Sequence, residues 1–461
     1  MKRIGLLLSV LSIIGCANNP LSSYKSTTDT RLSTINNSNS LNSVIAAQET
    51  DDVLYNMEFG TVLRMQANYE SSNIYYTKAQ NVIDTWIAFW TNSTQGQVSD
   101  TVTSLLVNDN ATDYDPRGYE KTLLPTMHAL NQIGLNNFDA ARIEIKKMYQ
   151  SEQAVQNHHE VDYEYARQEN AKIQKDRTDS YLDQQIKKNY NFQDVSSPEV
   201  LALTNSYQSA FSHYLAGFVF EALNEPSLAR PGYLNSGKLQ PNNILIQQSI
   251  DNLDKGQTKK SGFTNLLMVQ EVGHAPQIKS NEVHIPIDLN VVGTNSTCVN
   301  MINVFYPTLV EDKWQATLYQ YQLDNNVMTP VMMTNVNLMA AKALSEEMPH
   351  IITRNVFAAA RNIALSQASC STGGSIGTLL SLGTSIGGLL LDKADERNWN
   401  LLPAQYNVNR VSLPYGKHTI SINVAGKVYT QEINLTNSYQ VFSYRIIGNK
   451  VFFEPQVSML K

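Results

Sequence analysis

Residues 60–79 have the sequence GTVLRMQANYESSNIYYTKA, and this stretch decides the fold of the first half of the chain. A small residue, Gly60, is followed nine positions later by the aromatic Tyr69, and the small residues Ser72 and Ala79 come after it. This order is typical of two helices that cross at Gly60, the second beginning at Tyr69 and packing back through small side chains. The stretch therefore predicts a helical hairpin.

The pattern recurs twice, as ALNQIGLNNFDAARIEI at 129–145 and AGFVFEALNEPSLARPGYLNSGKLQP at 216–241. Tyr69 and Phe138 are 69 residues apart, close to two periods of roughly 34 residues. The pattern resembles the tetratricopeptide repeat, although the tryptophan of that repeat is missing. A generic helical bundle is the alternative. Both interpretations predict an α-helical domain over 49–250, because such hairpins bury their apolar faces only against neighbours. The matching positions are Gly60, Leu63, Ala67, Tyr69, Ser72, Tyr76 and Ala79, then Ala129, Asn136, Phe138, Ala141 and Ile145, then Gly217, Phe220, Asn224, Ala229, Tyr233 and Pro241.

Two surfaces of this domain are candidates for protein binding. Repeat proteins use extended concave surfaces, and here the aromatics Tyr69, Tyr76, Phe138 and Tyr233 are expected to form one. Residues 139–190 are rich in charge and carry few apolar positions, which predicts one long helix. Its sparse apolar stripe is either a contact face for another chain or part of a solvated helix.

The second half, 262–461, has the period of strands. Apolar runs separated by polar turns are followed by a predicted helix over 337–367 and a β-module over 405–456, where Ile420, Ile422 and Val424 alternate with polar residues before the turn at Ala425-Gly426. The predicted fold class is therefore α+β, with an N-terminal tetratricopeptide-like helical scaffold and a strand-rich mixed C-terminal half.

The chain begins MKRIGLLLSVLSIIGC, a short positive segment and an eleven-residue apolar run before Gly15 and Cys16. The run is too short to span about 30 Å of hydrocarbon as a helix. It resembles a bacterial lipoprotein signal, which implies removal of residues 1–15 and acylation of Cys16 with fatty acids such as palmitate. Ala17 follows, which implies the outer membrane, most readily its periplasmic face. The Asn-, Ser- and Thr-rich residues 16–48 are expected to be a flexible tether.

A glycine-rich apolar segment, 373–391, is a second candidate for membrane contact. Gly373, Gly377, Gly383 and Gly387 are spaced as in closely packed membrane helices. Six glycines and several hydroxyl residues weaken it as a helix, because glycine costs about 1 kcal/mol per residue there. A buried connecting segment is the preferred interpretation, and membrane insertion is the alternative.

Composition and motifs exclude more chemistry than they indicate. The formal net charge of -6 makes nucleic acid an unexpected partner, and the sequence contains no phosphate-binding loop, dinucleotide fingerprint or nucleophile elbow. His158 and His159 are adjacent and point about 100° apart on a helix, which disfavours a metal site. No cofactor, metal or catalytic residue is expected. Cys298 and Cys370 either form a disulfide or remain two buried thiols.

The order of features resembles an uncharacterised family of Gram-negative outer-membrane lipoproteins with tetratricopeptide-like repeats. The most specific phrase is ADERNWNLLPAQYNVNRVSLPYGKH at 394–418. The resemblance implies a cell-envelope role and no established activity. From the residue types, we expect an ion pair between Asp395 and Arg397, beside Trp399, to be structural and to pin the glycine-rich segment against the C-terminal strands. A ligand site is the alternative. The positions concerned are Asp395, Arg397, Trp399, Pro403 and Gly416.

Three functions follow as hypotheses. The first is a lipid-anchored, non-enzymatic scaffold that binds another envelope protein. The second is a membrane-active or secretion-complex component that uses 373–391. The third is an enzyme that acts on the cell wall, since active sites need not carry short motifs.

Overall fold

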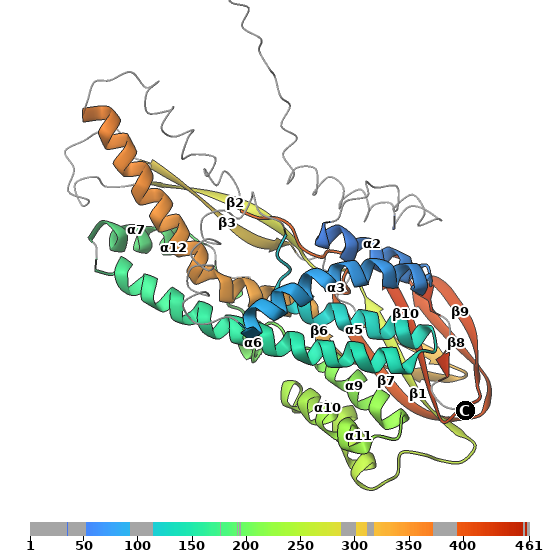
Figure 1. The fold of residues 1–461 in the computed structure, drawn as a ribbon. Helices are drawn as coiled ribbons and strands as arrows, with labels where there is room; N and C mark the ends of the chain where they lie inside the picture. Colours follow the sequence, from blue (N-terminus) through green and yellow to red (C-terminus); the bar gives the residue numbers. More distant parts are fainter. Residues whose placement is uncertain are drawn as a thin grey trace, which may run out of the picture.

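The computed structural model describes Ile35 and residues 52–92, 114–175, 177–190, 192, 195–286, 301–310, 318–371, 394–454 and 457–458 (Figure 1). The expected signal 1–15, Cys16, nearly all of the tether 16–48, Cys298 and the segment 373–391 lie outside these ranges. Within the described residues, no helix is long and apolar enough to cross a membrane.

The architecture is α+β, as predicted from the sequence. Helices dominate the first half and strands the second (Figure 1). The helices are α2 (Val53–Met65), α3 (Tyr69–Asn92), α5 (Gly118–Gly134), α6 (Phe138–Ile173), α7 (Arg177–Asn189), α8 (Pro198–Ala202), α9 (Ala210–Ala222), α10 (Pro226–Leu239), α11 (Ile244–Asp254) and α12 (Val336–Ser371). The strands are β1 (Phe263–Val272), β2 (Gln277–Pro286), β3 (Met301–Val310), β4 (Tyr321–Leu323), β5 (Asn326–Met328), β6 (Val331–Asn335), β7 (Gln405–Pro414), β8 (Gly416–Val424), β9 (Lys427–Leu435), β10 (Tyr439–Ile447), β11 (Lys450–Phe453) and β12 (Val457–Ser458).

The three predicted hairpins are α2–α3, α5–α6 and α9–α10, and their turns are alike. Ala67, Asn136 and Asn224 occupy the same place in each turn, and each has a φ near +60°. In each turn the backbone N–H that follows this residue donates to the carbonyl oxygen five residues earlier, at 2.8–3.0 Å. This arrangement satisfies carbonyl groups that the end of a helix leaves open. The internal repeat seen in the sequence is thus a repeat of structure.

Glycines set the helix crossings in these hairpins. A Cβ on Gly60 would lie 2.5 Å from the ring of Tyr76, and a Cβ on Gly217 would lie 2.5 Å from the ring of Tyr233. Only glycine leaves room for an aromatic ring at that distance. The predicted crossing at Gly60 is therefore confirmed.

The charged stretch 139–190 forms two helices, where the sequence predicted one. α6 ends at Ile173, and α7 turns back so that Leu182 and Ile186, both fully buried, join the core. The side chain of Gln174 bridges the turn, donating to Asp183 at 3.1 Å and accepting from Ser180 at 3.2 Å. Burial of the sparse apolar stripe explains the break, because a continuous helix would leave it in water.

The largest sheet has the strand order β11-β10-β1-β7-β6, with β12 also beside β10. β1 runs parallel to β10, pairing Leu267 with Val441, and antiparallel to β7. Alternate residues of β1 face two cores: Leu267 and Val269 pack with the helices, whereas Leu266 and Met268 pack with the second sheet, β5-β4-β8-β9. The molecule therefore has a helical layer, a central sheet and an outer sheet.

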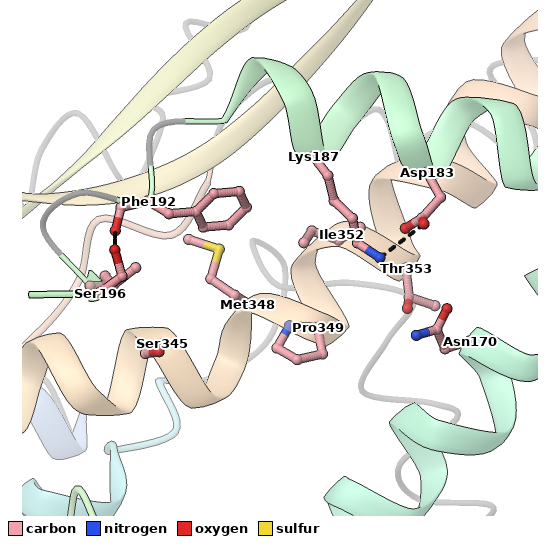
Figure 2. Close-up of a pocket in the computed structure, with 11 residues that line it drawn as sticks. Asn170, Asp183, Lys187, Phe192, Ser196, Ser345, Met348, Pro349, Ile352 and Thr353 are labelled. Atoms are coloured by element: carbon pink, nitrogen blue, oxygen red, sulfur yellow. Dashed lines mark hydrogen bonds and ion pairs between the residues drawn. The ribbon is translucent and has the colours of Figure 1, made fainter. Parts of the chain in front are cut away.

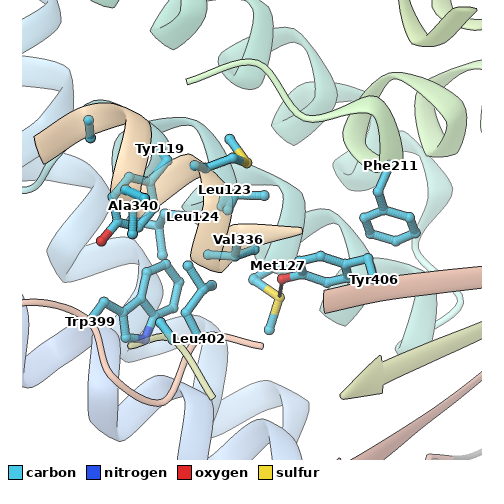
Figure 3. Close-up of a cluster of buried hydrophobic side chains, with 14 of the residues drawn as sticks. Tyr119, Leu123, Leu124, Met127, Phe211, Val336, Ala340, Trp399, Leu402 and Tyr406 are labelled. Atoms are coloured by element: carbon cyan, nitrogen blue, oxygen red, sulfur yellow. Dashed lines mark hydrogen bonds between the residues drawn. The ribbon is translucent and has the colours of Figure 1, made fainter. Parts of the chain in front are cut away.

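Segment 394–404 joins the two halves of the chain (Figure 3). Trp399 is fully buried; its backbone N–H donates to Glu120 at 2.7 Å and its indole N–H donates to Thr61 at 3.0 Å. The backbone N–H of Asn400 donates to Glu58 at 2.7 Å. The segment thus lies against α2 and α5. The glycine-rich segment 373–391 is outside the described residues, so the expected contact between the two stays a prediction.

Asp395, Arg397, Pro403 and Gly416, from the same phrase 394–418, contribute to the fold. Asp395 and Arg397 form an ion pair of 2.7 Å, and the backbone carbonyl of Arg397 accepts from Arg117 at 2.8 Å. Pro403 is buried. Gly416 has a φ of 134° at the turn from β7 to β8, where a side chain would be strained.

The predicted aromatic binding face is wrong for Tyr69, Tyr76 and Tyr233, which are at most 4% exposed. Phe138 is partly buried and packs against the same core. The inner helices α2, α5 and α9 are covered by segment 394–404 and the central sheet, so the chain itself fills the surface that an open repeat array would offer.

Candidate functional site

The most distinctive surface chemistry lies along the seam between α6 and α12. α12 leaves the core and extends along an arm that it forms with α7 and the β2–β3 hairpin (Figure 1). The side chain of Asn355 fastens α12 to this hairpin by donating to the carbonyl of Phe305 at 2.9 Å. Over residues 345–353, one side of α12 borders a cavity, whereas Glu346 contacts His159 of α6 and Glu347 contacts Arg117, the residue before α5.

The cavity lies between α7, the end of α6 and α12, and has a volume of about 350 Å³ (Figure 2). Its volume is at the lower end of the range of roughly 300–1,000 Å³ that is usual for ligand pockets. The apolar part of its wall is supplied by Phe192, Val195, Met348, Pro349 and Ile352. The polar part is supplied by Asn170, Asp183, Lys187, Ser196, Ser345 and Thr353.

Pro349 shapes this cavity through its missing amide hydrogen. In a regular helix the carbonyl oxygen of Ser345 would accept from the N–H of residue 349. Proline has no such donor, so this oxygen lacks its usual helical partner. Ser345 and Pro349 both line the cavity, so the carbonyl group without its helical partner belongs to a residue of the cavity wall.

An ion pair is fixed at the edge of the cavity (Figure 2). Lys187 donates to Asp183 at 2.9 Å, and the side chain of Asp183 is only 5% exposed whereas that of Lys187 is 43% exposed. Asp183 also accepts from Gln174 at 3.1 Å. The buried carboxylate therefore holds the ammonium group in place while that group remains in contact with solvent.

A second cluster of titratable groups lies further along the seam. His158 contacts Asp162 at 3.1 Å, and His159 contacts Glu346 of α12 at 3.5 Å. Trp90 packs edge-on against His158 with ring centres 4.2 Å apart. Lys121 of α5 lies 3.7 Å from the ring centre of Trp86 and contacts Asp115 at 2.7 Å.

Burial shifts the pKa values in this cluster toward the neutral forms. Desolvation raises the pKa of Asp162 to about 7, opposed by Lys121 and reinforced by Asp115 and Glu347. Desolvation lowers the pKa of His159 to about 4, and Lys121 and His350 lower it further. The pKa of His158 is also lowered, mainly by burial. Groups with such shifts mark candidate functional sites, and they occur in structural networks as well.

The structure separates the residues that the sequence singled out. His158 and His159 lie in the seam, and no group of three or more His, Cys, Asp or Glu within the described ranges is arranged to hold a metal ion. Cys370 lies in α12, whereas its proposed partner Cys298 is outside the described residues, so their disulfide stays a prediction.

The cavity itself was not anticipated from the sequence. The one available signal is Pro349, which stands inside a helix of 36 residues, where proline is costly. The residues that line the cavity come from three separate stretches, and no local pattern connects them. Comparisons with protein-family models, curated proteins and solved structures found no match to this chain.

Proposed function

We propose that this chain is a lipid-anchored, non-enzymatic scaffold of the bacterial outer membrane that faces the periplasm and binds another envelope protein at the cavity between α7 and α12. The anchor is the expected acylation of Cys16, which the segment MKRIGLLLSVLSIIGC indicates. The cavity carries the binding part of the proposal, because it combines apolar walls with a few fixed polar groups.

The position of the cavity supports a protein partner. The inner surface of the repeats is filled by the chain's own segment 394–404, whereas the arm has a preformed hollow. Protein interfaces gain most of their affinity from large side chains that enter such hollows. Met348 adds adaptability, because methionine side chains repack around different apolar groups.

Site-specific photocrosslinking in living cells tests the proposal. A photoreactive amino acid is placed at Ser196 or Lys188, beside the cavity, and as controls at Ile74 or Val428, which are 59% and 60% exposed on other elements. We expect one discrete crosslinked protein from the cavity positions and none from the controls. Equal crosslinking from all four positions, or none from any, would contradict the proposal.

Two further variants test the lipid anchor and the binding cavity separately. Cys16→Ala should release the protein from the membrane fraction, because the lipids are lost. Ser345→Trp should abolish the crosslink by filling the cavity, and its circular dichroism should match that of the parent. Degradation of cell-wall fragments by the purified protein, without any crosslinked partner, would favour an enzyme instead.

A further inference from the structure

The two helical stretches around the cavity differ in charge from the rest of the chain. Residues 167–190 contain six basic and four acidic residues, and residues 345–371 contain two arginines and two glutamates. Together they carry a net charge of +2, whereas the whole chain carries -6. A basic region within an acidic protein favours an approaching group of negative charge, because steering depends on the local field.

The charges nearest the cavity lie where a ligand would meet them. Lys187 lines the cavity, Lys188 follows it on the exposed end of α7, and Lys172 and Lys175 are exposed at the end of α6. An ammonium group has three hydrogens, and the bond from Lys187 to Asp183 uses one of them. The remaining hydrogens can meet a carboxylate without breaking the existing pair.

The interior of the cavity requires a different chemistry. Phe192, Met348 and Ile352 offer an apolar wall, and Thr353 offers a hydroxyl group that can accept from a backbone N–H. A large apolar side chain satisfies the first and its own peptide group satisfies the second. Both groups occur together in a protein segment.

We propose, resting on the function proposed above, that the partner presents an acidic segment: a large apolar side chain that enters the cavity between α7 and α12, flanked by aspartate or glutamate residues that contact Lys187 and Lys188. The apolar anchor supplies affinity, and the carboxylates supply orientation and a faster association. Exposed charges are screened by salt, so binding weakens as ionic strength rises.

Fluorescence anisotropy with synthetic peptides tests this proposal on the full chain carrying Cys16→Ala. The probes are labelled peptides of sequence EDELFDEE, KKKLFKKK and EDEGSDEE, which separate the charge from the anchor. We expect EDELFDEE to bind at least tenfold more tightly than either of the others. A rise in salt from 50 to 500 mM should weaken it several-fold.

Variants then assign the contacts. Lys187→Glu and Lys188→Glu should each weaken EDELFDEE at least fivefold, and Lys427→Glu, an exposed position on β9, should leave it unchanged. Thermal unfolding of each variant shows that it is folded. Equal binding of the three peptides would overturn the proposal, and so would binding of EDELFDEE that neither Lys187→Glu nor Lys188→Glu weakens. Displacement of the peptide by vesicles of phosphatidylglycerol would also overturn it. If EDELFDEE does not bind but the cavity positions still crosslink to a partner, the acidic segment is rejected and the docking site is kept. If neither peptide binding nor crosslinking is seen, the docking site itself is rejected.

Discussion

Arg64 of α2 and Glu271 of β1 form an ion pair of 2.7 Å, and neither side chain is more than 3% exposed. Glu454 contacts the same guanidinium at 2.8 Å, and Asn131 accepts from it at 2.9 Å. The four residues come from positions spread between 64 and 454, so one buried cation ties the first hairpin, the second hairpin and the central sheet together. Such a network places strict demands on the fold, because a buried charge is costly without its partners.

Removal of this cation should destabilise the whole protein. Arg64→Met keeps most of the volume but leaves Glu454 buried without its cation and Glu271 with only Arg445, at 3.5 Å, so we expect a loss of about 3–5 kcal/mol in the free energy of unfolding. Urea denaturation followed by circular dichroism measures it. The matched control is Arg230→Met, whose partner Asp254 lies 2.8 Å away with both side chains more than 40% exposed. That variant should lose less than about 1 kcal/mol. Similar losses in the two variants would show that the buried network is not special.

Substitution of Trp399 should also destabilise the protein. Trp399→Ala is expected to cost about 3–5 kcal/mol, because it empties a fully buried site against α2, α3 and α5. Trp399→Phe should cost less, about 1–3 kcal/mol, since it removes mainly the hydrogen bond to Thr61. Thermal unfolding should show helices and strands melting in one transition. Two separate transitions in the wild-type protein would contradict the shared core.

Substitution of glycine by alanine should change the stability in opposite directions at two positions. Gly60→Ala would place a Cβ 2.5 Å from the ring of Tyr76 and should destabilise by about 1–3 kcal/mol. Gly237→Ala, in α10, meets no atom closer than 3.6 Å and should stabilise by up to about 1 kcal/mol, because alanine is a better helix former. Both values come from urea unfolding midpoints. A harmless Gly60→Ala would mean that the hairpin crossing tolerates a wider spacing.

Ionisation of the buried Asp162 should make the folded protein less stable as the pH rises. Its pKa is about 7 in the folded protein, mainly through burial, and about 4 in an unfolded chain. Between these values the folded state holds a proton that the unfolded state has lost, so stability falls with increasing pH. Asp162→Asn lacks this loss, and its stability relative to the wild type should therefore increase from pH 4 to pH 7 and then level off.

A residue two positions further along α6 provides the opposite case. Hydrogen bonds from Arg167 and Gln168 lower the pKa of Glu164, so its contribution to stability is present at neutral pH and is lost as the pH falls through the folded value. Relative to the wild type, Glu164→Gln should therefore become less stable as the pH rises through the acidic range. Urea unfolding at a series of pH values measures both variants. Parallel curves for Asp162→Asn and the wild type would show that Asp162 is not desolvated.

Much of the architecture was predictable because it depends on local patterns. The spacing from Gly60 to Ala79 predicted the first hairpin, and the alternation of Ile420, Ile422 and Val424 predicted β8. The predicted helix 337–367 agrees with α12 at 336–371, and the predicted module 405–456 agrees with β7 to β11. The division of 139–190 into two helices was missed, since the break results from the packing of Leu182 and Ile186 rather than from a proline or glycine.

By itself, the sequence determined the hairpins and the strands, because helix crossings and alternation are encoded within a few turns of chain. Only the tertiary structure decided which surfaces remain open. Tyr69, Tyr76 and Tyr233 were expected on a binding face, and they are buried because their rings pack at helix crossings, on Gly134, Gly60 and Gly217. The cavity beside Lys187 likewise depends on contacts between α6, α7 and α12, which lie up to about 180 residues apart in sequence. Contacts at that separation depend on how whole elements pack, and no local pattern records them.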